Sequence, residues 1–204
     1  MAILKEVQMD SLKSVAIEYP FTAGTVEQLK AGQFVSLSGR IVTCRDRAMQ
    51  YLVNGGKSNV DLKNVAIYNC GPLIIWNNGK WIVRSAGPTT SSRTEMYIQR
   101  FLDQFHCHVI IGKGGIKNMH KISNKYKCVY MELVGGTAAL VADRIIEVKD
   151  VYFLKEFGSA EAMWDMVVKD LMCVVVTDIS GHDLHRKVEI ASRRRLNHLI
   201  ESCK

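Results

Sequence analysis

Two short motifs bring hydroxyl groups, cationic side chains and glycines together. The first, GPTTSSR at residues 87–93, contains Thr89, Thr90 and Arg93, and the second, GKGG at residues 112–115, contains Lys113 and Gly114. A guanidinium, an ammonium and backbone N–H groups that glycine leaves uncovered are the groups that hold a carboxylate best. The two motifs therefore predict a pocket for a small anion.

The first motif also predicts the start of a helix. Ser92 and, three residues later, Glu95 have the form of a capping box, and apolar residues follow at helical spacing: Ile98, Phe101, Leu102 and Phe105. Arg93 would lie in the first turn, where a cation opposes the helix dipole by about 0.3–1 kcal/mol and a bound anion would offset that cost. The alternative is that Thr89 and Thr90 only cap the helix while Arg93 is solvated.

The second motif follows a short apolar run. Residues 108–111, HVII, predict a buried strand that ends in a glycine-rich turn carrying Lys113. The turn is not a phosphate-binding P-loop, which needs four residues between its first glycine and GK and a hydroxyl residue after the lysine. Taken alone, GKGG is better explained as a simple turn, so its meaning depends on the other motif.

Five motifs occur in order along the chain: LSGRIVTCRD at residues 37–46, GPTTSSR at 87–93, VIIGKGG at 109–115, GSAEAMW at 158–164 and VVVTDISG at 174–181. Together they resemble the beta subunits of two-subunit iron–sulfur hydro-lyases, the L(+)-tartrate dehydratases and class I fumarate hydratases. The resemblance covers nearly the whole chain. It implies an α/β fold similar to a swivelling β/β/α domain, with half of the active site supplied by a cluster-bearing alpha subunit.

The resemblance also implies a role for individual residues. Thr89 is implied as the catalytic residue that transfers a proton, and Asp46 as a supporting residue. The implied substrate-binding residues are Arg45, Thr90, Arg93, Lys113 and Gly114. The alternative for Arg45 and Asp46 is a local ion pair at the end of a strand, typically worth about 0–1 kcal/mol.

Dehydration of a 2-hydroxy diacid makes heavy demands on such a site. A weakly acidic C–H beside a carboxylate must lose its proton while the neighbouring hydroxyl departs. A cation about 4 Å from the developing charge contributes on the order of 4 kcal/mol at an effective dielectric near 20, which makes two arginines and a lysine significant. A threonine hydroxyl is a poor base in water, so Thr89 needs nearby cations and N–H donors that stabilise its alkoxide.

The favoured function is dehydration of L(+)-tartrate to oxaloacetate. The segment GKWIVRSAGPTTSSR at residues 79–93 and the extended C-terminal helix are more similar to tartrate dehydratases. Two-subunit fumarases also carry GPTTS and GKGG, so a fumarate hydratase that interconverts malate and fumarate is the first alternative. A non-catalytic carboxylate-binding or regulatory subunit is an alternative from another class.

Several positions depart from the family pattern. Met49 stands where a histidine is expected, and methionine cannot transfer a proton. Asn69 and Cys70 stand where tartrate dehydratases tend to have His and Ala, and Thr94 replaces a common methionine. These changes bear on substrate identity and support the non-catalytic alternative.

In this family the departing hydroxyl meets the unique iron of a [4Fe–4S] cluster. The six cysteines of this chain are widely separated and include no CxxC pair: Cys44, Cys70, Cys107, Cys128, Cys173 and Cys203. They have the character of small buried thiols, so no metal ligand is expected on this chain. We therefore expect the cluster on a partner alpha subunit, in a heterodimer or heterotetramer, and a chain that is catalytically incomplete alone.

Length and composition indicate a single domain over residues 1–204, with 48% hydrophobic residues. No signal peptide or apolar run of the roughly 20 residues that a membrane span needs is expected, and unpaired cysteines favour the cytoplasm. The net charge of +7 and the arginines at 193–195 raise nucleic-acid binding as an alternative. The chain lacks a stacking stripe of aromatic residues, so an acidic partner or an anionic substrate explains the charge better.

Periodicity predicts a β-rich N-terminal part followed by alternating helices and strands. In the first part, strands are expected near Val35 and Ile41 and at residues 65–68 and 81–85. Later elements are expected as helices at 116–125 and after Gly136, strands at 128–134, 145–155, 164–170 and 173–178, and a polar helix from about Leu184.

Overall fold

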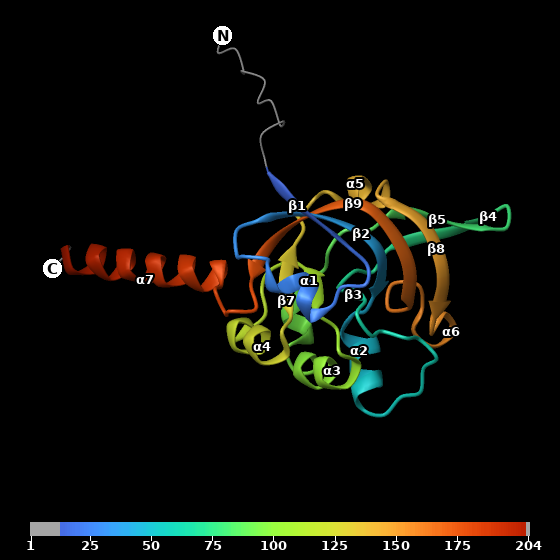
Figure 1. Ribbon diagram of the computed structural model, residues 1–204, viewed down its shortest axis with the longest axis horizontal. Helices are drawn as coiled ribbons and strands as arrows, with labels where there is room; N and C mark the ends of the chain where they lie inside the picture. Colours follow the sequence, from blue (N-terminus) through green and yellow to red (C-terminus); the bar gives the residue numbers. More distant parts are fainter. Residues whose placement is uncertain (1–12, 203–204) are drawn as a thin grey trace, which may run out of the picture.

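A seven-stranded sheet with the order β1-β2-β3-β6-β7-β9-β8 forms the centre of the computed structural model, which describes residues 13–202 (Figure 1). Its strands are β1 (Ser14–Glu18), β2 (Phe34–Thr43), β3 (Ala66–Tyr68), β6 (Val109–Gly112), β7 (Val129–Glu132), β8 (Ile145–Tyr152) and β9 (Met163–Thr177). Because β2 pairs with β9 as well as with β1 and β3, the strands β2, β3, β6, β7 and β9 close into a barrel-like ring.

The strands β2, β3, β6 and β7 run parallel to one another. Parallel strands covered on both faces are apolar throughout, and β6 follows this rule. Val109 and Ile111 contribute to one core with side chains from around the ring, whereas Ile110 faces the opposite core. That second core packs against the helices α2 (Asp46–Val53), α3 (Ile98–Phe105) and α4 (Met119–Tyr126).

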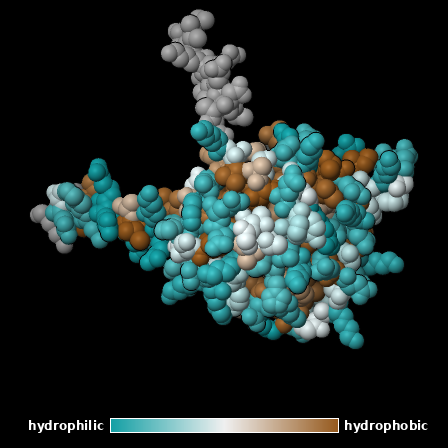
Figure 2. Space-filling model, viewed as in Figure 1, coloured by the Kyte–Doolittle hydropathy of each residue, from teal (hydrophilic) through white to brown (hydrophobic). Residues whose placement is uncertain are grey.

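Two elements extend from opposite sides of this body in Figure 1. One is a separate hairpin of β4 (Leu73–Asn77) and β5 (Lys80–Ser85), and the other is the long helix α7 (Leu184–Ser202). Helix α7 buries none of its side chains, and Figure 2 shows apolar patches between its polar groups. None of the helices within residues 13–202 combines the length and apolarity that crossing a lipid bilayer requires.

The remaining helical segments are short: α1 (Ala23–Glu27), the 3-10 turn η2 (Ser91–Thr94), α5 (Ala138–Ala142) and α6 (Leu154–Phe157). The element order confirms the predicted α/β class, with a β-rich first part and alternation from α3 to α7. The closure of the sheet into a ring, through the pairing of β2 with β9, was not predicted from the sequence. The swivelling-domain description and the single domain over residues 1–204 stay predictions.

Some predicted boundaries were wrong. The two strands expected near Val35 and Ile41 are one strand, β2, and the strands expected at 164–170 and 173–178 are joined in β9. Both are long because they pair with each other over most of their length, with a register shift between Leu37 and Gly39. The strand expected to reach residue 155 ends at Tyr152, where the backbone enters α6.

Candidate functional site

Arg45 and the GKGG turn, two of the predicted binding features, follow the carboxyl ends of parallel strands of the central sheet. Arg45 comes after β2, Asn69 after β3, and Lys113 and Gly114 after β6. Because these strands are parallel, their carboxyl ends meet at one edge of the sheet, which is where open α/β sheets usually bind ligands. The topology therefore brings Arg45 and the GKGG turn to the same edge, on either side of Asn69.

Residues 89–91 cross this edge and join the two motifs directly. The backbone N–H and the hydroxyl of Thr89 both donate to the Asn69 carbonyl oxygen, at 2.7 and 2.9 Å. Thr90 then pairs with Lys113 in a parallel bridge, and the Ser91 N–H donates to the Lys113 carbonyl oxygen at 2.9 Å. The two motifs, which together predicted an anion pocket, are therefore joined in one continuous backbone structure.

Asn69 holds this crossing together, a role that the sequence did not reveal. Its side-chain amide donates to the Cys44 carbonyl oxygen at 2.8 Å, and its backbone N–H donates to the Ile111 carbonyl oxygen at 2.8 Å. Its Oδ1 and the Ser91 hydroxyl are both buried and have no hydrogen-bond partner within residues 13–202. Asn69 thus links the ends of β2, β3 and β6 to Thr89, and the only signal in the sequence was its departure from the family pattern.

Arg45 is fixed by Glu161. The Arg45 guanidinium lies 2.9 Å from Glu161 Oε1 and donates to the Ala160 carbonyl oxygen at 3.2 Å. The alternative of a local Arg45–Asp46 ion pair is therefore wrong, and Asp46 instead lies in the first turn of α2, where an acid favours the helix dipole. Burial raises the pKa of Glu161, and the charge of Arg45 opposes that rise. Glu161 was missed as a site residue although it belongs to the GSAEAMW motif.

Gly71 leaves the space that this guanidinium occupies. A Cβ at Gly71 would lie 2.7 Å from Arg45 Nη1 and 2.7 Å from the Ala160 carbonyl oxygen. We expect Gly71→Ala to displace the Arg45 side chain and, in an assembled active enzyme, to raise KM about tenfold, because a shift of about 1 Å in a positioning group can cost up to 10²-fold. Steady-state kinetics would measure the effect, with Gly135→Ala as the control because a Cβ there meets no atom within 4 Å. Wild-type kinetics for Gly71→Ala would contradict this placement of Arg45.

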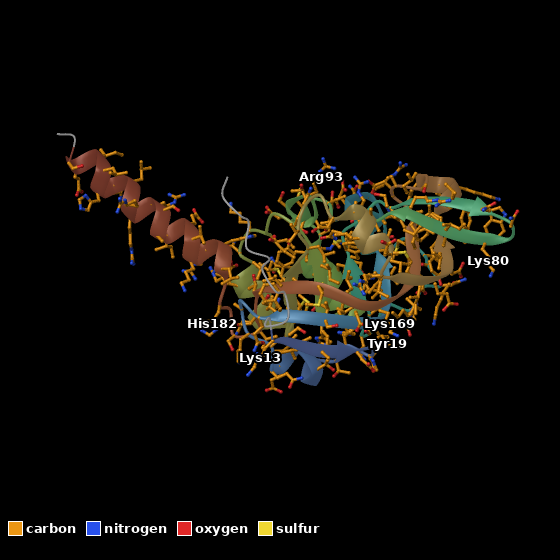
Figure 3. All side chains as sticks on the ribbon, turned by 90° about the horizontal axis from the view of Figure 1, so that it is seen from above. Lys13, Tyr19, Lys80, Arg93, Lys169 and His182 are labelled. Carbon is orange, nitrogen blue, oxygen red and sulfur yellow. The ribbon has the colours of Figure 1, made fainter. Side chains whose placement is uncertain are left out.

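Arg93 lies outside a regular helix, so the predicted capping box was wrong. Residues 91–94 form the 3-10 turn η2, and α3 begins at Ile98. Glu95 accepts a hydrogen bond from the Lys117 N–H at 2.9 Å and does not cap Ser92. The predicted apolar face of the helix is confirmed in α3. Arg93 itself is exposed, and Figure 3 shows its side chain pointing away from the body.

Met49, which stands where the family pattern has a histidine, is a core residue. Its side chain is fully buried on α2, in the core between the sheet and the helices. A methionine there packs against apolar neighbours and leaves no polar group unsatisfied. The departure at position 49 therefore places an apolar side chain in the core beneath α2.

The cysteines do not fit an iron–sulfur cluster. Cys44, Cys70, Cys107, Cys128 and Cys173 are all buried, and Cys203 lies outside the described residues. Burial raises the pKa of the Cys70 and Cys173 thiols to about 12, which disfavours the thiolate that ligates iron. Within residues 13–202 no three His, Cys, Asp or Glu side chains are grouped as a metal site.

Known proteins resemble this chain over most of its sequence. The sequence matches the family described as Fumarase C-terminus over residues 2–188. It is 37% identical over 190 residues to a Geobacillus stearothermophilus protein named for class I fumarate hydratase, covering 92% of this chain and 36% of that protein. The chain thus spans little more than a third of that relative's length.

Two relatives of similar length are named as beta subunits. A Methanocaldococcus jannaschii protein named for the beta subunit of L(+)-tartrate dehydratase is 36% identical over 193 residues, covering 90% of this chain and 99% of that protein. The L(+)-tartrate dehydratase subunit beta of Escherichia coli K12 is 31% identical over 180 residues, covering 86% of this chain and 89% of that subunit. The chain therefore belongs to the Fumarase C-terminus family, among the beta subunits of L(+)-tartrate dehydratases and the class I fumarate hydratases.

Proposed function

We propose that this chain is the beta subunit of a hydro-lyase that dehydrates a small hydroxy-dicarboxylate, with L(+)-tartrate as the favoured substrate and oxaloacetate as the product. A partner alpha subunit carries the [4Fe–4S] cluster in this proposal, because the five cysteines within residues 13–202 are buried and dispersed and do not fit one. The observation that carries the proposal is the crossing of residues 89–91 over Lys113 at the carboxyl ends of β3 and β6.

In the proposed complex, Lys113 and Arg93 bind the substrate carboxylates from the exposed side of the crossing. Both side chains are exposed in the isolated chain, so a partner and a substrate can reach them. Arg45 contributes from the end of β2, where Glu161 holds its guanidinium in one orientation. Gly114 has a φ of +74°, a conformation that turns its N–H without a side chain in the way, and Thr90 supplies a further hydroxyl.

Thr89 is the proposed proton-transferring residue. Its hydroxyl donates a hydrogen bond to the Asn69 carbonyl oxygen, which is too weak a base to take the proton. Before Thr89 can accept a proton from the substrate, this hydrogen bond must break and the hydroxyl proton must pass to water. Lys113 and Arg93 are the cations that could stabilise the resulting alkoxide. Proton transfer by Thr89 is therefore coupled to the same charges that bind the substrate.

Serine and valine at position 89 distinguish the role of the Thr89 hydroxyl from that of its shape, because serine keeps the hydroxyl and valine keeps the branched side chain. In an active complex we expect Thr89→Val to lower kcat by about 10²- to 10⁴-fold, the usual contribution of positioned proton transfer. Thr89→Ser keeps the hydroxyl and is expected to stay within about tenfold of the wild type, since only a methyl group is lost. Equal activity of both variants would contradict the role of the hydroxyl and leave carboxylate binding to be tested separately.

A fumarate hydratase that interconverts malate and fumarate is the second candidate. The Geobacillus relative named for class I fumarate hydratase favours it. The binding groups described above suit either diacid, because each substrate presents two carboxylates. The choice therefore depends on a direct assay of turnover.

The experiment is anaerobic co-purification of the chain with its cluster-bearing partner, followed by parallel assays on L-tartrate, malate and fumarate. We expect turnover of one of these, with L-tartrate first, and loss of turnover in Thr89→Ala, Arg93→Ala and Lys113→Ala. A complex that binds a diacid without converting any of the three would favour the non-catalytic carboxylate-binding subunit. A complex that neither binds nor converts them would refute both.

A further inference from the structure

Glu132, the last residue of β7, lies beneath the GKGG turn and has no role in the site described so far. Its Oε1 accepts hydrogen bonds from the Gly115 N–H at 3.0 Å and from the Tyr130 hydroxyl at 3.3 Å. Its Oε2 lies 3.3 Å from Nε2 of His185. Glu132 is the register partner of Gly112, so its side chain reaches from the neighbouring strand to the far end of the turn.

The turn that carries Lys113 is held at both ends. On one side, the Lys113 carbonyl oxygen accepts the Ser91 N–H, and on the other, Gly115 donates to Glu132. Between these contacts, Gly114 and Gly115 have φ values of +74° and +68°. Glycine adopts this conformation readily but loses more conformational entropy than other residues when it is fixed. Without the Glu132 contact, the hydrogen bonds from the Leu133 N–H to Gly112 and from the Ser91 N–H to Lys113 would fix only the first half of the turn.

Packing alone does not hold the Gly115 end. A cavity of about 440 Å³ borders the turn and is lined by Gly114, Gly115, Tyr130 and His185 among others. His185 covers one side of Gly115, because a Cβ there would lie 2.5 Å from its Nδ1. The remaining space leaves room for the turn to move if its hydrogen bond to Glu132 is lost.

Tyr130 and His185 in turn fix the carboxylate of Glu132. Burial raises the pKa of Tyr130 far above its usual value, so its hydroxyl stays protonated and donates to Glu132. His185 lies in the first turn of α7 and approaches the second carboxylate oxygen. The carboxylate is thus held from two directions while it binds Gly115.

We infer that Glu132 is a positioning residue that anchors the Gly115 end of the turn and thereby sets where the Lys113 ammonium meets a substrate carboxylate. This inference rests on the proposed function for the role of Lys113, but the anchoring itself does not. The competing explanation is that Glu132 only satisfies the buried Tyr130 hydroxyl and acts on stability alone.

Amide hydrogen exchange in the full chain tests the anchoring without any assay of turnover. In Glu132→Ala we expect the amides of residues 112–116 to exchange at least about tenfold faster, since the turn opens locally. Glu132→Gln keeps an oxygen acceptor and should exchange like the wild type, as should Tyr130→Phe, which keeps the Gly115 contact. Glu147→Ala removes an exposed carboxylate of β8 as a matched control. Wild-type exchange in Glu132→Ala, or equally fast exchange in Tyr130→Phe, would overturn the inference.

Kinetics of the assembled complex test the consequence for Lys113. We expect Glu132→Ala to raise KM for the dicarboxylate about tenfold with a smaller change in kcat, because misplacing a binding group weakens substrate binding first. Glu132→Gln should return KM to within about threefold of the wild type. An unchanged KM in Glu132→Ala would overturn the positioning role. If the wild-type complex turns over no diacid, the proposed function fails, and the exchange result still decides whether Glu132 anchors the turn.

Discussion

Lys113→Ala is expected to lower kcat/KM of the assembled enzyme for its dicarboxylate by about 10²- to 10³-fold, the usual cost of removing one group that stabilises developing charge. The ammonium is expected to act on charge at close range, where one cation contributes on the order of 4 kcal/mol at an effective dielectric near 20. The backbone crossing should survive, because Lys113 contributes its carbonyl oxygen to it and not its side chain. Steady-state kinetics and a binding measurement with the diacid would check the loss.

Lys117 provides the matched control for this substitution. It lies four residues further along the chain and is also exposed, and its backbone N–H donates to Glu95. We expect Lys117→Ala to keep kcat/KM within about threefold of the wild type, since surface charges away from the reaction contribute little. Equal losses of kcat/KM in the two variants would mean that activity depends on the overall positive charge of this surface. Lys113 would then have no specific role in binding the substrate.

Gly112→Ala is expected to abolish most activity and to destabilise the chain. A Cβ at residue 112 would overlap the Ser91 side chain and lie 3.2 Å from Asn69 Oδ1, so the crossing segment must move. Overpacking of this kind typically costs about 1–3 kcal/mol of unfolding free energy. We expect at least about a 10²-fold loss of kcat/KM in addition, because Thr89, Thr90 and Lys113 shift together. Urea unfolding and kinetics would measure the two effects.

A second substitution shows whether the losses come from steric overlap with Ser91 or from a general destabilisation of β6. Ser91→Ala removes the hydroxyl that the new Cβ overlaps, so the Gly112→Ala/Ser91→Ala chain should recover part of both losses. In a double-mutant cycle, the double variant should therefore lose less than the sum of the two single losses. Strictly additive losses would contradict the close approach of residue 112 to the crossing.

The local elements of the site could be predicted from the sequence, whereas the long-range hydrogen bonds that join them could not. The glycine-rich turn after a buried strand is confirmed in β6, because apolar run length and turn chemistry are local properties. The capping box failed because the Ser91 N–H bonds to Lys113 and Glu95 bonds to Lys117, which are contacts with a segment about twenty residues away. Local propensity at Ser92 could not reveal that competition.

Long-range pairing explains the other differences. Arg45 follows β2, whereas its partner Glu161 precedes β9, and only the β2–β9 pairing brings the two segments together. That pairing also extends β2 through the polar residues between Val35 and Ile41, where alternation alone suggested two strands. Asn69 and Glu132 were missed for the same reason, since each acts through contacts with other strands.

The most direct test compares the purified chain, its cluster-bearing partner and an anaerobic mixture of the two in diacid assays. We predict that neither protein alone turns over L-tartrate, malate or fumarate and that the mixture converts one of them. Lys113→Ala in the mixture should lower kcat/KM for this conversion by about 10²- to 10³-fold. Full turnover by the chain alone with stoichiometric iron bound to it would contradict a shared active site, and so would a stable complex that converts none of the three.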